Sequence, residues 1–183
     1  MAWTNPTTRS TGNLITASIW NTDLVDNLNY LKGVADQVDG FNTIVKTGDE
    51  TLSSSTTLQD DNQLAFSVVA SKIYGFKAMI QIDLAASAMG FKCGWSYPSG
   101  TTITWCKTSR EADVGTFMSN TLQESGTENW IANSTGGFTV GLFGSIYVST
   151  TPGTIQFRWA QNTSNASVLT VRTGSFIEYF LLN

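Results

Sequence analysis

Strict alternation of apolar and polar residues after position 41 constrains the fold of this chain more than any other feature. In the stretch "IYGFKAMIQIDLA", every second residue from Tyr74 to Leu84 is apolar, and those between them form a largely polar set. Side chains along a β-strand point alternately to opposite faces, so this pattern is typical of a strand that buries one face. The alternation recurs in residues 64–68, 138–148 and 155–159. It predicts eight or more short strands.

Turn-forming glycine, proline and asparagine residues separate these stretches, and no helical spacing of apolar residues follows Gly40. Many short strands without helices predict a mainly β fold, an antiparallel β-sandwich or jelly roll over residues 41–183. Residues 109–126 are polar and irregular, and we expect a long loop there. The expected core contains Tyr74, Phe76, Ile80, Ile82, Val140, Leu142 and Phe157, with Trp95, Trp105 and Trp159 on the same apolar sides of their strands.

The first 39 residues follow a different pattern. Pro6 and Gly12 prevent regular structure in residues 1–15, which predicts an extended arm. One short amphipathic α-helix is expected in residues 16–39, with Thr16 or Ser18 as its N-cap. Its apolar stripe steps by four, three, four and three through Leu24, Leu28, Leu31, Ala35 and Val38.

A helix of this length is marginal without a partner surface, and Gly33 weakens it by about 1 kcal/mol relative to alanine. We therefore predict that residues 1–39 anchor the chain to an assembly. The predicted anchor contacts are Trp3, Ile15, Trp20, Leu24, Leu28 and Leu31.

The terminal stretch "SFIEYFLLN" is apolar on both faces. Phe176 and Phe180 fall on one face, and Ile177, Tyr179 and Leu181 fall on the other. A strand that is apolar on both faces has to be covered twice, once by the core and once by another element. In a small β domain the second cover is often another subunit, so we predict a trimer interface through Ile177, Tyr179 and Leu181.

Two cysteines, Cys93 and Cys106, flank the stretch "GWSYPSGTTITW". We interpret this stretch as a hairpin that turns at residues 98–100 and pairs Trp95 with Trp105 on one buried face. In that register Cys106 points away from Cys93, because successive side chains alternate between faces. The pattern therefore predicts two free thiols.

Catalytic patterns are sparse. The sequence contains no histidine, which excludes the Ser-His-Asp and Cys-His mechanisms and most zinc hydrolases. No glycine-rich phosphate loop is present, and we expect no enzyme activity, metal or cofactor. Asp60 and Asp61, with Asp49 and Glu50, could indicate a glycosidase pair or a calcium site, but a solvated turn before the strand "LAFSVV" is the favoured interpretation.

Charge and hydropathy limit the partners. Lysine and arginine are scattered in a chain of net charge −4, which argues against nucleic-acid binding. No apolar run reaches the length of a signal peptide or a membrane span, so we expect synthesis in a cytosol and no membrane partner. Trp130, in "TENWIANS", is the aromatic residue most expected to be exposed, and an exposed ring can stack on a sugar.

The opening "AWTNPTTRSTGNLITASIWNTDLVDNLNYLK" resembles the start of many structural proteins of tailed bacteriophages and prophages. The matching residues are Trp3, Thr4, Gly12, Ile15, Thr16, Ala17, Asn21, Asp26, Asn27, Leu28 and Leu31. They cover about the first fifth of the chain. The ending "VLTVRTGSFIEYFLL" is similar to the closing strands of trimeric jelly rolls of the tumour-necrosis-factor type.

These resemblances imply a virion protein made in the host bacterial cytoplasm, a homotrimer with an N-terminal anchor to other virion proteins of the capsid or the tail. The small β domain and short anchor favour a capsid decoration or head-fibre protein. The alternative is a tail-tip or fibre protein that recognises a host surface glycan, with Trp130 as a contact. No catalytic residue carries over from the resemblance.

Overall fold

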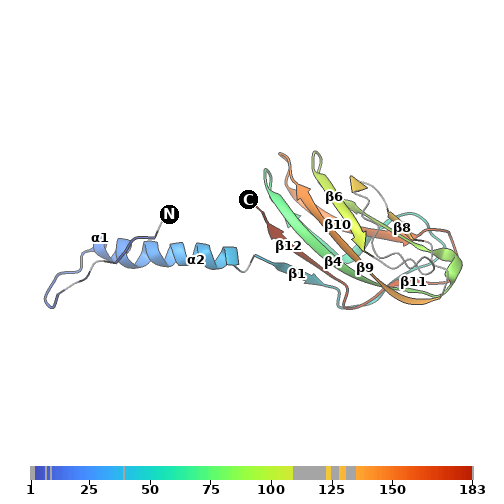
Figure 1. Cartoon of the computed structure of the whole chain (residues 1–183), viewed down its shortest axis with the longest axis horizontal. Coiled ribbons are helices and arrows are strands. Elements are labelled where there is room, and N and C mark those ends of the chain that lie inside the picture. The colour runs from blue at the N-terminus through green and yellow to red at the C-terminus, as the bar shows by residue number, and fades with distance from the viewer. Residues whose placement is uncertain are drawn as a thin grey trace. The chain divides into compact units, whose positions relative to one another are not determined.

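A computed structural model describes residues 3–6, 8, 10–38, 40–108, 123–124, 128–130 and 135–182, with the backbone alone for residues 34–38, 108, 123–124 and 128–130. The chain divides into two compact units, Met1–Gly40 and Phe41–Asn183 (Figure 1). In the described part of the chain, no helix is both long enough and apolar enough to cross a membrane.

The N-terminal unit is one continuous helical segment preceded by the arm. Its parts are α1 (Ala17–Trp20), a π-helical turn η1 (Asn21–Val25) and α2 (Asp26–Val38). Thr16 is the N-cap: its backbone is extended, and its Oγ1 accepts a hydrogen bond of 3.3 Å from the Ile19 backbone N–H. The chain reverses before the helix at Gly12, whose φ of +89° suits glycine. Figure 1 shows the arm returning alongside the helix.

The second unit consists of two antiparallel sheets, which confirms the predicted mainly β sandwich. The first sheet has the order β1–β12–β4–β9–β6–β7, and β11 joins β2 to β4. The second has the order β3–β10–β5–β8. The first contains β1 (Asn42–Val45), β2 (Glu50–Leu52), β4 (Ile73–Leu84), β6 (Thr102–Thr108), β7 (Gln123–Glu124), β9 (Gly136–Tyr147), β11 (Leu169–Val171) and β12 (Phe176–Leu181). The second contains β3 (Gln59–Val68), β5 (Phe91–Ser96), β8 (Glu128–Trp130) and β10 (Gly153–Gln161), and a short 3-10 helix η2 (Ser87–Met89) precedes β5.

The core lies between the two sheets and contains every residue that the alternation assigned to it. Ile80, Val140, Leu142 and Phe157 have no exposed surface, and Tyr74, Phe76 and Ile82 are buried beside them. Trp95, Trp105 and Trp159 are also buried. The period-two pattern therefore predicted the inner face of each of these strands correctly, because burial selects for apolar side chains on that face.

The predicted hairpin at residues 98–100 is wrong. β5 pairs with β10 and β8 in the second sheet, while β6 pairs with β9 and β7 in the first. The intervening segment therefore crosses between sheets. Trp95 and Trp105 still meet, but across the core, with ring centroids 6.5 Å apart and planes at 84°. Cys93 is buried and Cys106 is half-buried, and neither forms a disulfide, as predicted.

Candidate interaction surfaces

The outer face of the first sheet carries a group of apolar side chains that are partly or largely exposed in the described part of the β domain. The strand registers place Val45 beside Phe176, Phe176 beside Met79, and Met79 beside Gly141. Val45, Met79 and Phe143 are each close to half exposed. We call this surface the outer apolar face and define it by Val45, Met79, Phe143, Phe176 and Phe180.

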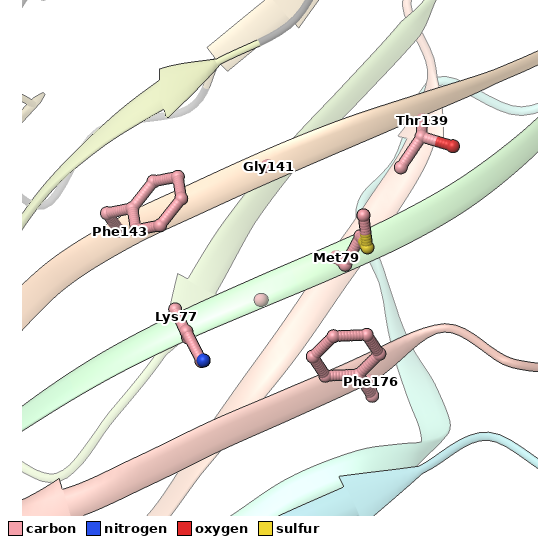
Figure 2. A pocket seen from close by; sticks show the side chains of 7 residues that line it. Lys77, Met79, Thr139, Gly141, Phe143 and Phe176 are labelled. Atoms are coloured by element: carbon pink, nitrogen blue, oxygen red, sulfur yellow. The ribbon is translucent and has the colours of Figure 1, made fainter.

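A shallow hollow of about 460 Å³ opens on this face. Figure 2 shows Lys77 and Met79 of β4, Gly141 and Phe143 of β9, and Phe176 of β12 around it. Gly141 lies opposite Met79 and adds no side chain, so the space over this part of the sheet stays open. The hollow is lined mainly by apolar groups, which is typical of a site that accepts an apolar side chain from a partner.

The charges on this surface are paired within the chain. Lys77 Nζ lies 2.6 Å from Glu178 Oε2, and it also lies 5.7 Å from the ring centroid of Phe41. Phe41 packs on Phe180 with ring centroids 4.9 Å apart. Because Lys77 and Glu178 already neutralise one another, a partner that covers this face would not leave an unpaired charge buried.

The prediction that Ile177 belongs to a trimer interface is wrong. Ile177 is fully buried in the core of its own chain, opposite Ala78 of β4. Tyr179 also turns inward and stacks on Phe66 of the second sheet, with centroids 4.1 Å apart and planes at 16°. Burial raises the pKa of the Tyr179 hydroxyl above 10.0, and the nearby Tyr74 adds to this. The outward apolar residues of β12 are Phe176 and Phe180, whereas Leu181 is half exposed and remains a predicted contact.

The N-terminal unit has its own exposed apolar groups. All six predicted anchor residues are exposed, from 38% for Leu24 to 60% for Ile15. Leu24, Leu28 and Leu31 follow one another at helical spacing along η1 and α2, so they form one strip on the helix. We call these three residues the leucine strip.

Asn27 holds the arm against the helix. Its Oδ1 accepts a hydrogen bond of 3.0 Å from the Thr4 backbone N–H, and its Nδ2 donates one of 2.7 Å to the Thr4 carbonyl oxygen. Nδ2 also donates to the Asp23 carbonyl at 3.2 Å, and the side chain is buried. The Trp3 ring packs at 6.1 Å from that of Tyr30. Thr4 and Asn27 both belong to the phage-like motif, but the motif alone did not indicate that they contact each other.

Asp61 does not lie in a solvated turn, contrary to the interpretation of the sequence. It is buried on β3, where it pairs with the equally buried Lys46. Lys46 Nζ donates to Asp61 Oδ1 at 2.9 Å, to Asp61 Oδ2 at 2.8 Å and to Glu50 Oε2 at 2.7 Å. The alternation of apolar residues carries no signal for such a group.

The other two acids of this region have separate partners. Asp49 Oδ1 accepts hydrogen bonds from the Thr173 N–H at 2.7 Å and from Thr173 Oγ1 at 2.9 Å. These bonds hold the pKa of the Asp49 carboxyl below its ordinary value. Asp60 pairs with Arg158 Nε at 2.7 Å on the surface. Among the described residues, no three or more Asp, Glu, Cys or His side chains gather in a group that could hold a metal ion.

Trp130, the predicted glycan contact, is described only as backbone. It lies on β8 opposite Phe91, and its side chain falls outside the described residues. The long polar loop predicted at residues 109–126 also lies largely outside them, apart from β7.

Comparison with known proteins shows distant structural similarity only. The chain is similar to the Eiger TNF of S. frugiperda, at 9% identity and a TM-score of 0.37 over 79% of this chain and 94% of that one. It is also similar to the tripod (BppUct-A-L) from the baseplate of bacteriophage Tuc2009, at 10% identity and a TM-score of 0.34 over 97% and 98%. A third similarity is to infectious bursal disease virus Gt strain, at 10% identity and a TM-score of 0.20 over 77% and 40%.

No protein-family model matches the sequence, and no curated protein matches it. With identities near 10% and TM-scores below 0.5, the structural similarities assign neither a partner nor a function to this chain.

Proposed function

We propose that this chain is a structural, non-enzymatic component of a tailed-phage virion, a homotrimer that attaches to other virion proteins through residues 1–39. The observation that carries the proposal is the leucine strip. Leu24, Leu28 and Leu31 are exposed on a helix whose arm is already held in place by Asn27. A short helix with an exposed apolar strip gains stability when a partner covers that strip.

The outer apolar face supports the trimer. Its apolar side chains surround a hollow, and its central lysine is paired within the chain. Burying one such side chain fully contributes roughly 1.5–3 kcal/mol, so several of them can hold subunits together. Three linked anchors would also bind a particle more strongly than one, because each binding event after the first is intramolecular.

Within this class we favour a capsid decoration or head-fibre protein, because one small β domain follows a short anchor. The alternative is a tail-tip or fibre protein that recognises a host surface glycan. Trp130 remains the proposed contact for that role. Loss of glycan-array binding in Trp130→Ala, with unchanged addition to particles, would favour the alternative.

Deletion of residues 1–39 tests the assignment of roles. The truncated protein should remain a soluble trimer by light scattering and should no longer add to particles depleted of the full-length protein. A truncated protein that adds as well as the full chain would refute the anchor. A monomer that still adds would show that the two roles are reversed.

A matched pair of single variants tests the leucine strip itself. Leu28→Asp places a charge on the strip, whereas Asn29→Asp places the same charge on the next exposed position of the helix. We expect Leu28→Asp to reduce addition to particles and Asn29→Asp to leave it unchanged, with the β domain melting normally in both. Equal loss in both variants would point to a general effect of charge and would contradict the strip as the contact.

A further inference from the structure

A lysine and an aspartate are in direct contact inside the β domain, and a glutamate touches the same lysine. The Lys46 ammonium donates to both oxygens of the Asp61 carboxylate and to Glu50 Oε2. The Lys46 and Asp61 side chains are 1% and 0% exposed, and that of Glu50 is 14% exposed. An amine held against a carboxyl group in a dry site has the arrangement of reactants for amide formation.

We propose that Lys46 and Asp61 are joined by an intramolecular isopeptide bond that the folded protein forms by itself, with Glu50 as the catalytic acid and base. The proposal is independent of the virion assignment. It adds a modification site that links the two sheets, because Lys46 follows directly on β1 of the first sheet and Asp61 lies on β3 of the second.

The proximity of the Lys46 amine to the Asp61 carboxylate favours amide formation. Contacts of 2.9 and 2.8 Å to the two carboxylate oxygens hold Lys46 Nζ next to the carbon that it would attack. Groups held in reacting geometry behave as if present at very high concentration. Backbone hydrogen bonds maintain this position on the lysine side, where the Lys46 N–H donates to the Ser175 carbonyl and the Gly174 N–H donates to the Lys46 carbonyl, each at 2.8 Å.

Burial of the two side chains also favours the reaction. The Lys46 and Asp61 side chains are 1% and 0% exposed, so bulk water is excluded from the reacting pair and cannot compete with the amine for the carboxyl carbon. Glu50 Oε2, at 2.7 Å from Lys46 Nζ, is in position to carry a proton from the Lys46 ammonium. The Asn62 N–H donates to the same Glu50 oxygen at 3.0 Å and orients the carboxylate.

Hydrogen bonds donated to the Asp61 carboxylate also favour the reaction. Asp61 Oδ1 accepts from the backbone N–H groups of Gln63 and Leu64, each at 3.0 Å. These two donors are placed to stabilise the negative charge that develops on Oδ1 when the amine attacks. Asp61 Oδ2 accepts one bond of this kind, from Trp159 Nε1 at 3.1 Å, so we assign Oδ1 as the oxygen that carries the charge and Oδ2 as the one that departs.

The reaction balances without an oxidant or a further reactant. Glu50 takes one proton from the Lys46 ammonium and passes it to Asp61 Oδ2. The Nζ lone pair then forms a bond to Cγ while the carbonyl electrons move to Oδ1. Glu50 accepts a second proton from the nitrogen and delivers it to the Oδ2 hydroxyl. The Cγ–Oδ2 bond breaks, the carbonyl re-forms, and the products are one amide and one water molecule.

Mass spectrometry of the folded, full-length protein tests the proposal. The intact chain should be lighter than its sequence by the mass of one water. Trypsin should fail to cleave after Lys46 and should leave residues 33–72 as one peptide that lacks one water. Fragmentation of that peptide should yield no separated fragments from cleavage between residues 46 and 61, because the new bond closes a ring there.

The chain contains its own control for proximity. Lys77 and Glu178 are in contact at 2.6 Å, but their side chains are 47% and 23% exposed and lie on the surface. Trypsin should cleave normally after Lys77.

Glu50→Gln should fold, keep the contact with Lys46 and show the full mass, since an amide cannot carry the proton.

A folded wild-type protein with the full mass and normal cleavage at Lys46 would overturn the proposal and leave a buried ion pair only. A missing water located outside residues 46–61 would overturn it as well. A cross-link that forms fully in Glu50→Gln would overturn the role of Glu50. If Glu50→Gln fails to fold, the wild-type peptide map still decides whether the bond exists.

Discussion

The ring of Phe180 lies directly over Gly75, so that a Cβ at position 75 would sit 2.5 Å from the Phe180 Cζ atom. Gly144 is equally crowded, but its Cβ would meet the Thr104 carbonyl oxygen at 2.4 Å. A Cβ added at each glycine would displace a different group. Phe180 is a partly exposed side chain on the outer surface, whereas Thr104 O belongs to the backbone of β6.

This difference predicts unequal effects of the same substitution. In Gly75→Ala the Phe180 ring can rotate outward, so the free energy of unfolding should fall less than in Gly144→Ala. In Gly144→Ala the sheet itself has to shift, and overpacking of this kind costs roughly 1–3 kcal/mol or more. Denaturant unfolding of the isolated variants measures both values. A larger loss in Gly75→Ala than in Gly144→Ala would contradict this account.

Charge on the outer apolar face should dissociate the proposed trimer. Met79→Glu and Phe143→Glu each place a carboxylate where subunits would meet, and an unpaired carboxylate is costly to bury. Both side chains are close to half exposed within one chain, so neither substitution should unfold the β domain. Light scattering measures the mass of each.

Val69→Glu is the matched control, because Val69 is 60% exposed and lies just after β3, outside the outer apolar face. It should leave the trimer intact. A trimer that survives both Met79→Glu and Phe143→Glu would exclude this face as the interface.

Loss of the Asn27 side chain should release the arm. Asn27→Ala removes two hydrogen bonds to Thr4, each worth about 1 kcal/mol, so exchange of the Thr4 amide hydrogen should accelerate by roughly 30-fold. Asn29→Ala changes an exposed asparagine on the same helix and should have no such effect. Hydrogen exchange followed by nuclear magnetic resonance measures both. Equal protection of Thr4 in the two variants would show that Asn27 does not hold the arm.

Asp49 should make stability depend on acid pH. Hydrogen bonds from Thr173 lower the pKa of Asp49 in the folded state below 3.8, so the folded state favours the ionised carboxyl. Its stabilising contribution is present above pH 3.8 and is lost as the pH falls through the lowered pKa. Asp49→Asn should therefore be less stable than the wild type at neutral pH, and the two should converge in strong acid. A difference in unfolding free energy that stays constant with pH would contradict this assignment.

The sequence by itself determined the mainly β fold, the inner face of most strands and a helix capped by Thr16 or Ser18, of which the structure selects Thr16. These features follow from local chemistry. Burial imposes a period of two on strands such as β4, and a threonine hydroxyl satisfies a free N–H at the start of a helix. The odd and even positions of Cys93 and Cys106 also predicted that the two would not form a disulfide. This prediction is confirmed, although the predicted hairpin between them is wrong.

Only the tertiary structure decided which strands pair and which face of β12 points outward. Trp95 and Trp105 occupy different sheets, and alternation cannot show this because it records the face of a residue but not its neighbouring strand. β12 is apolar on both faces, so its orientation depends on the register that places Ile177 beside Ala78. Lys46 and Asp61 became a buried pair because strands of two sheets bring them together, and their burial depends on that long-range contact.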